Sequence, residues 1–109
     1  MMNYHDPHQH IFRALADPTR RAILSMLSQG ERPIGEIASE FEMTRPAVAK
    51  HLKILKEGDL ISITEAGRER IHSLNPTPLK SASDWLNFFD QFWDDKLTQL
   101  KTQVEQSND

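Results

Sequence analysis

The sequence predicts one mainly α-helical domain with a small β-hairpin, and its elements follow the order α-α-α-α-β-β-α. A chain of 109 residues is long enough for a single hydrophobic core but leaves little surplus stability. Apolar residues recur at helical spacing in four stretches before residue 58 and again over residues 81–104, whereas residues 60–74 alternate as strands do. We therefore treat residues 1–109 as a single domain that begins with a tail over residues 1–9.

The composition is that of a soluble protein. Charged residues make up 27% of the chain and hydrophobic residues 38%, and no apolar run approaches the ~20 residues of a membrane-spanning helix. The first residues do not place an apolar segment after a basic one, so we expect no secretory signal. Because the chain has no cysteine, disulfides and thiolate metal sites are excluded. We expect a cytoplasmic protein without a cofactor.

The first element is a short helix that follows a polar tail. The tail region holds three histidines, His5, His8 and His10. Imidazole groups bind zinc, copper and nickel, but no further ligands stand at a suitable spacing downstream. We therefore favour a solvated tail and expect no metal site. Residues 10–15 then predict a helix that buries Ile11, Phe12 and Leu15.

The second helix has clear start and stop signals. Asp17 is a favourable N-cap, and Pro18 follows it at a position where the missing N–H costs nothing. The helix is predicted to run to residue 28, and Gly30 supplies the residue that ends it. Arg20 and Arg21 lie in its first turn, the unfavourable end of the helix dipole for a positive charge. They form either a solvated face or contacts with phosphate groups.

Two further helices are joined by a short turn. Residues 33–41 predict a short helix, residues 42–44 a turn, and Thr44 caps a helix over residues 44–57. Val48, Leu52 and Leu55 stand at i, i+4 and i+7, which places them on one apolar face. This arrangement is typical of a helix-turn-helix, in which the second helix reads DNA. The alternative is an ordinary corner between two helices of a helical core.

The charge of the second helix favours the DNA-binding interpretation. Residues 43–56 hold four Lys or Arg and no Asp or Glu, although the whole chain has a formal net charge of −3. Residues 81–109 hold six acids and two lysines, so the charges are segregated along the chain. A segregated charge gives the electrostatic field a direction, which steers docking. Taken alone, a basic run of this kind is more often a solvated face.

Residues 60–74 predict a β-hairpin whose tip is basic. Residues 60–64 and 69–74 have strand patterns, and residues 65–68 form the turn with one glycine. Arg68 lies at the tip and Arg70 lies close behind it. A two-stranded hairpin is marginal alone, so it must pack on the helices. A basic hairpin after a helix-turn-helix predicts a winged helix, in which the hairpin is the wing.

The last predicted helix, over residues 81–104, is unusually aromatic. Residues 75–78 form a stiff linker before it, and Ser81 or Ser83 is the expected cap. Five of the eight aromatic residues of the chain fall between Trp85 and Trp93. Such a stripe is too rich for one small core to cover, so it indicates a homodimer interface rather than an intramolecular core. With the first helix, the expected interface residues are Ile11, Phe12, Trp85, Phe88, Phe89, Phe92, Trp93, Leu97 and Leu100.

The chain as a whole resembles the ArsR-type family of small bacterial winged-helix repressors, and within it the autorepressor branch with a tryptophan- and phenylalanine-rich last helix. The matching segments are Ala14–Leu24, Gly35–Ala38, Arg45–Leu55, Gly67–Arg68 and Leu74–Pro76. The resemblance implies a homodimer, paired through the first and last helices, that binds a palindromic operator and represses transcription.

Three features depart from the family pattern. The third helix has no cysteine and no histidine follows His72, so neither family route to metal sensing is expected. Ala49 stands where a serine is usual in the reading helix, which removes a hydroxyl contact. Gly58-Asp59 replaces a small residue followed by glycine, so we expect Asp59 to adopt a left-handed conformation.

We expect the helix over residues 44–57 to enter the major groove. Arg45 is the expected direct base contact, because Arg pairs bidentately with guanine. Smaller or shorter side chains would lie against base edges, and other basic ones against phosphates. The expected DNA-binding residues are Thr44, Arg45, Pro46, Ala47, Ala49, Lys50, His51, Lys53, Arg68 and Arg70.

Two other functions stay open at this point. The first is a winged-helix protein-interaction module without DNA binding, which the acidic net charge and Ala49 support. The second is a repressor gated by a small apolar effector enclosed at the dimer interface. An enzyme is not expected, because the chain shows no nucleophile triad, phosphate loop or paired carboxylates.

Overall fold

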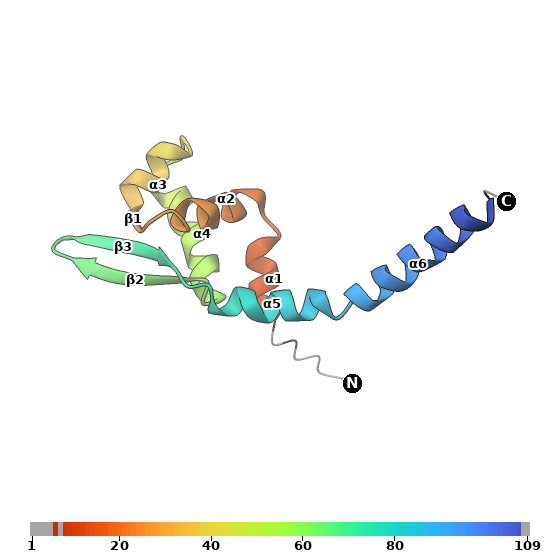
Figure 1. Cartoon of the computed structure of the whole chain (residues 1–109). Helices are drawn as coiled ribbons and strands as arrows, with labels where there is room; N and C mark the ends of the chain where they lie inside the picture. The colour runs from red at the N-terminus through yellow and green to blue at the C-terminus, as the bar shows by residue number, and fades with distance from the viewer. Residues whose placement is uncertain (1–5, 7, 108–109) are drawn as a thin grey trace, which may run out of the picture.

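The computed structural model describes residue 6 and residues 8–107, so residues 1–5 of the predicted tail, including His5, lie outside the described residues. Four helices precede a hairpin and two further helices follow it (Figure 1). The elements are α1 (Gln9–Leu15), α2 (Pro18–Leu27), β1 (Arg32–Pro33), α3 (Ile34–Glu40), α4 (Arg45–Glu57), β2 (Ile61–Ala66), β3 (Glu69–Leu74), α5 (Thr77–Asn87) and α6 (Asp90–Ser107). The predicted winged helix-turn-helix is confirmed.

The predicted N-caps of α2 and α4 are confirmed by their hydrogen bonds, whereas α2 ends at Leu27 with Ser28 as its C-cap and not at Gly30. The Asp17 carboxylate accepts from the backbone N–H groups of Thr19 and Arg20, at 2.7 and 3.2 Å. The Thr44 hydroxyl accepts from the N–H of Ala47 at 3.3 Å. Asp59 has a φ of 56°, the left-handed conformation expected after α4.

The arginines that open α2 have a role inside the fold that was not predicted, although Arg21 is also exposed, as a solvated face requires. Arg20 Nε donates to the carbonyl of Ala14 and its Nη2 to that of Arg13, both at 2.9 Å. Arg21 Nη1 donates to the carbonyl of Leu15 at 2.7 Å. The last carbonyls of a helix lack intrahelical donors and carry its negative dipole end. Both arginines therefore cap the C-terminus of α1.

One strand was missed by the sequence analysis. Arg32 and Pro33 form β1, which pairs antiparallel with β3, so the sheet has the order β1-β3-β2. Pro33, predicted as the first residue of the third helix, is instead the extended residue before it, with φ −74° and ψ 158°. A two-residue strand has no periodicity of its own, and only its pairing with Ile71 and His72 defines it.

The final helix begins earlier than predicted and is broken. The expected linker contributes Thr77 and Pro78 to the first turn of α5. Proline is tolerated there because a backbone N–H in the first turn has no partner within the helix, so nothing is lost by its absence. Neither Ser81 nor Ser83 is therefore the cap. At Phe88 and Phe89 the chain leaves the α-helix, and α6 then continues to Ser107. The order of helices and strands thus gains β1 and a second terminal helix.

The core lies where α1–α4 meet the base of the hairpin. The apolar face predicted for α4 is confirmed, since Val48, Leu52 and Leu55 are all buried. The other buried hydrophobic residues of this cluster are Ile11, Ala14, Ile23, Leu24, Leu27, Ile37, Ala38, Leu60, Ile61 and Ala82. Among the described residues of the two terminal helices only Ala82 belongs to this buried set, and the partly buried Leu79 packs against it, so the core ends in the middle of α5.

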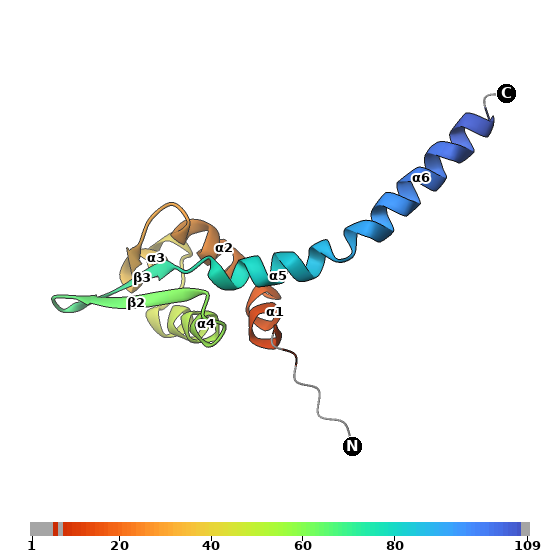
Figure 2. The same cartoon turned by 60° about the horizontal axis from the view of Figure 1, so that its bottom comes forward.

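Helix α6 projects away from this body in both views (Figures 1 and 2). The radius of gyration is 19.7 Å, whereas a compact domain of this length has about 13 Å. Among the described residues, no helix is long and apolar enough to cross a membrane. The projecting helix instead leaves its apolar residues without a covering element of the same chain.

Candidate nucleic-acid interface

Helix α4 presents a basic outer face opposite its buried one. Val48, Leu52 and Leu55 are buried on the inner face because they stand at i, i+4 and i+7, and most residues between them therefore point outward. No acidic residue interrupts this helix before Glu57, its last residue. Its exposed residues are Arg45, Pro46, Ala49, Lys50, Lys53, Lys56 and Glu57, and the cap Thr44 is also exposed. Ala47 is partly buried.

Arg45 lies over the start of α3. A Cβ atom at Gly35 would stand 2.8 Å from Arg45 Nη2, closer than real Cβ atoms approach other atoms. Gly35 therefore leaves room for the guanidinium group, which is the tip of a flexible side chain. Among the described residues, Arg45 forms no ion pair within 4.0 Å. Its charge is available to an external anion.

Unlike most of the predicted DNA-binding residues of α4, His51 faces the core of the domain. It is partly buried, and its Nδ1 lies 3.4 Å from Nη1 of Arg20. Desolvation alone would raise the pKa of Asp17, but hydrogen bonds from the N–H groups of Arg20 and Thr19 outweigh it. Electrostatic interactions with Arg20 and His51 lower that pKa further. His51 thus belongs to a charged cluster that joins α4 to the α1–α2 corner.

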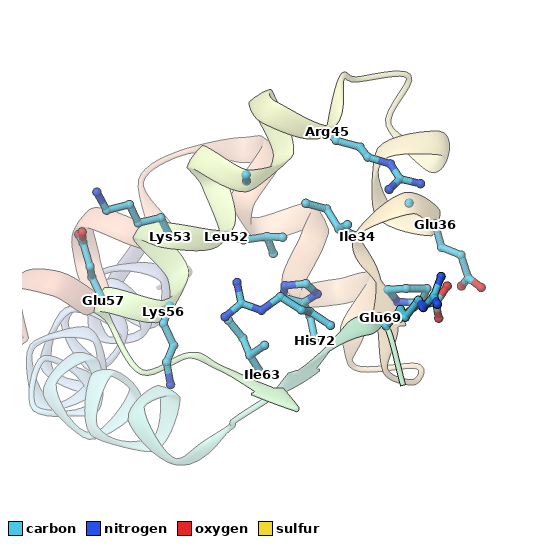
Figure 3. A pocket seen from close by; sticks show the side chains of 15 residues that line it. Ile34, Glu36, Arg45, Leu52, Lys53, Lys56, Glu57, Ile63, Glu69 and His72 are labelled. Atoms are coloured by element: carbon cyan, nitrogen blue, oxygen red, sulfur yellow. The ribbon is translucent and has the colours of Figure 1, made fainter. Parts of the chain in front are cut away.

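The hairpin, α4 and the start of α3 line an open cavity of about 820 Å³ (Figure 3). Arg45 and Lys56 lie near its two ends, with Leu52, Ile63 and His72 between α4 and the hairpin. Its basic lining residues are Arg45, Lys53, Lys56, Arg68 and Arg70, and its acidic ones are Glu36, Glu57 and Glu69. The structure therefore brings the basic residues of α4 and of the wing to one concave surface. Lys56 was missed by the sequence analysis, although the acid-free run that predicted the others includes it.

His72 is the buried polar residue of this cavity, with 5% of its surface exposed. Burial lowers its pKa, and the charge of Arg70 adds to this effect, while a hydrogen bond with the backbone of Arg32 opposes it. Among the described residues, its Nδ1 has no hydrogen-bond partner. The predicted packing role of His72 is confirmed, with more burial than expected.

A second surface lies on the terminal helices and is apolar. The exposed fractions of its large side chains lie between 39% and 65%. They are Trp85, Leu86, Phe88, Phe89, Phe92, Trp93, Leu97, Leu100 and Val104. Leu86 and Val104 were not among the expected interface residues. Of the two candidates on α1, Phe12 packs against Trp85 with ring centroids 5.2 Å apart, whereas Ile11 is buried in the core of its own chain.

Comparisons with known proteins identify the family. A family model described as bacterial regulatory protein, arsR family, matches residues 17–62. The HTH-type transcriptional regulator Rv2034 of Mycobacterium tuberculosis is 38% identical over 109 residues, which cover 100% of this chain and 98% of the relative. This chain belongs to the ArsR family. The transcriptional repressor SdpR of Bacillus subtilis is 40% identical over 82 residues, which cover 74% of this chain and 91% of SdpR.

Solved structures of ArsR-family proteins have the same fold. An ArsR-like transcriptional regulator from Rhodococcus sp. RHA1 superposes with a TM-score of 0.76 at 28% identity, over 91% of each chain. The crystal structure of another ArsR family transcriptional regulator gives a TM-score of 0.75 at 35% identity, over 86% of this chain and 97% of that one.

Membership of the ArsR family makes this chain a transcriptional regulator and not an enzyme. Within the part of the chain that the structure describes, no three His, Asp or Glu side chains come together as a group that could hold a metal ion. His8 instead contacts Asp6 and Ser81, with its Nδ1 3.3 Å from the Asp6 carboxylate and its Nε2 2.8 Å from the Ser81 hydroxyl. This contact ties the residue before α1 to α5.

Proposed function

We propose that this ArsR-family chain is a sequence-specific repressor that binds a palindromic operator in double-stranded DNA as a homodimer. One observation carries the proposal: three exposed basic residues of α4, Arg45, Lys53 and Lys56, line the same concave surface as Arg68 and Arg70 of the wing. A helix that offers a cationic, small-residue face suits the major groove, and a basic hairpin beside it suits the flanking backbone.

Within this surface the residues divide between base and phosphate contacts. Arg45 pairs with a guanine after its guanidinium leaves Gly35. Four neighbours lie against base edges or a thymine methyl group: Thr44, Ala47, Ala49 and Lys50. Pro46 fixes the first turn of α4 without removing a needed hydrogen bond. The phosphate contacts come from His51, Lys53, Arg68 and Arg70, and Lys56 joins Lys53, Arg68 and Arg70 on the concave surface.

The homodimer follows from the uncovered apolar stripe on the terminal helices. Trp93, Leu97, Leu100 and Val104 are spaced by four, three and four residues, which gives one continuous stripe along α6. A second copy of the chain would cover this stripe, together with the aromatic residues of α5 and Phe12. In this dimer two copies of α4 would enter successive major grooves, about 34 Å apart.

Repression is supported by relatives. SdpR is named a transcriptional repressor, and its match covers 91% of its length. A dimer bound across a promoter blocks RNA polymerase by occupying the same DNA. The site of action of such a protein is the bacterial cytoplasm, where the chromosome lies.

The test is a titration of labelled DNA from the region upstream of the protein's own coding sequence. We expect binding tighter than to random DNA of the same length at two salt concentrations, with both affinities falling as salt rises. Equal binding to both DNAs at both concentrations would favour a protein-interaction module instead. A monomer in light scattering would refute the role given to α5 and α6.

A further inference from the structure

The cavity between α4 and the hairpin has an apolar floor as well as a basic rim. Ile34, Leu52 and Ile63 line it around His72 (Figure 3). A surface used only for phosphates has no need of such a floor, because phosphates are bound by exposed donors and cations. A cavity of about 820 Å³ also lies in the range of small-molecule sites, which combine apolar walls with a few convergent polar groups.

His72 supplies a hydrogen-bond acceptor at this floor. Burial lowers its pKa, so the ring is neutral and has one N–H donor and one acceptor. Its hydrogen bond with the Arg32 backbone favours protonation, so the ring nitrogen acts there as the donor. Since Nδ1 has no partner, that donor is Nε2, and Nδ1 keeps a lone pair. A buried acceptor without a donor is costly, so a donor brought by a ligand would be favourable.

The charges around the floor favour an anion. Two of the three acidic lining residues pair with arginines outside the cavity lining: Glu57 with Arg13 at 3.3 Å, and Glu36 with Arg32 at 3.7 Å. Among the described residues, Glu69 is the remaining acid against five basic lining residues. Arg70 lines the same cavity as His72 and acts electrostatically on it, so an anion held by Arg70 would lie in the part of the cavity near His72.

We propose that this cavity binds a planar aromatic carboxylic acid that carries an N–H or O–H group. The carboxylate pairs with the arginines of the rim, the ring lies on the apolar floor, and the N–H or O–H donates to His72 Nδ1. Planar rings suit the site because arginine side chains stack on them as well as pair with carboxylates. Because Nδ1 has no solvent contact in the unliganded chain, the side chains that cover it must move before a ligand reaches it.

This inference rests on the proposed function for its consequence. Because the acid would occupy Arg45, Arg70 or both, it would compete directly with DNA for the same residues. The repressor would then be released by a ligand bound on its DNA-facing surface, and not at the dimer interface.

The test uses the full chain without DNA and three matched probes in calorimetry and amide NMR. Indole-3-carboxylate has the ring, the N–H and the carboxylate, naphthalene-1-carboxylate lacks the N–H, and indole lacks the carboxylate. We expect saturable binding of the first probe, and affinities about tenfold lower for each of the other two. Shifts should concentrate at Ile34, Leu52, Ile63 and His72. Equal affinity for all three probes, no saturation, or shifts confined to α5 and α6 would overturn the proposal.

Protein variants give a second measurement. Arg70→Gln should weaken indole-3-carboxylate about tenfold, and the control Lys96→Gln on α6 should leave its affinity unchanged. His72→Phe should remove the preference for indole-3-carboxylate over naphthalene-1-carboxylate. If that variant does not fold, the comparison of the two probes on the unaltered chain still decides the question. A preference retained in folded His72→Phe would overturn the role of His72.

The two proposals fail in different ways. Operator binding without binding of indole-3-carboxylate overturns the ligand site alone. Binding of the acid without any preference for operator DNA overturns the repressor and leaves the site standing. Where both bind, the acid should displace operator DNA with a midpoint that rises with DNA concentration, and a ternary complex would overturn the shared surface.

Discussion

Lys53→Gln is the sharpest test of the phosphate contacts. Lys53 is exposed on the outer face of α4, and among the described residues it forms no ion pair within 4.0 Å. Its charge therefore has no role inside the fold that the substitution would remove. Glutamine and lysine have similar helix propensities, so the free energy of unfolding should change by less than about 0.5 kcal/mol. Any change in DNA binding then reports the lost charge.

The expected magnitude follows from counterion release. Each phosphate contact contributes about 0.9 to the slope of log affinity against log salt. Each protomer brings one Lys53, so the slope should become shallower by about one unit per protomer and about 1.8 per dimer. Between about 50 and 200 mM salt, this difference changes the ratio of wild-type to variant affinity by about twelvefold.

Fluorescence anisotropy with labelled operator and random DNA, at several salt concentrations, measures this slope. Binding to both DNAs should weaken by a similar factor, because a phosphate contact carries no sequence information. Lys80→Gln is the matched control, since Lys80 lies on α5 and pairs with Asp84 at 3.4 Å. Parallel salt dependences for Lys53→Gln and wild type would refute the assignment, as would a loss confined to the operator.

Three further substitutions test the fold and the dimer. Leu97→Asp places a charge in the apolar stripe of α6, so the variant should be a monomer in light scattering. If it still dimerised as tightly as the wild type, α6 would be excluded from the interface. Asp17→Asn should make the free energy of unfolding depend less on pH in acid. The lowered pKa of Asp17 stabilises the fold above the ordinary value of 3.8, and this stabilisation is lost as the pH falls through the folded-state pKa. Unchanged acid denaturation of the variant would contradict this. Gly58→Ala should lower the free energy of unfolding, measured by urea denaturation, by about 1–3 kcal/mol, because the new Cβ would lie 3.0 Å from the backbone oxygen of His10. Unchanged stability would show that α1 shifts freely.

Local signals in the sequence were sufficient for the helix-turn-helix. Asp17 and Thr44 are caps whose hydrogen bonds reach only two or three residues along the chain, so neighbouring residues decide them. The burial of Val48, Leu52 and Leu55 follows from helical spacing in the same way. The basic surface was also largely predictable, because the residues of one helix face are fixed once the helix is known.

Features that depend on distant contacts were not predictable. Strand β1 exists through its pairing with β3, some forty residues later, and the break between α5 and α6 has neither proline nor glycine to mark it. Arg20 and Arg21 looked misplaced because their partners are carbonyls of the preceding helix. The free acceptor of His72 depends on α4, β1 and the wing together, so no local pattern contains it.

In the proposed dimer, helix α1 would couple dimerisation to DNA reading. On one side it packs against α4, where Arg13 pairs with Glu57 and the absence of a Cβ at Gly58 admits the carbonyl of His10. On the other side Phe12 packs against Trp85 of α5. Any second copy that docks on α5 therefore fixes α4 through a single intervening helix, with little freedom between them. In the proposed dimer, the packing of α1 would therefore set the spacing of the two reading helices and hence of the operator half-sites.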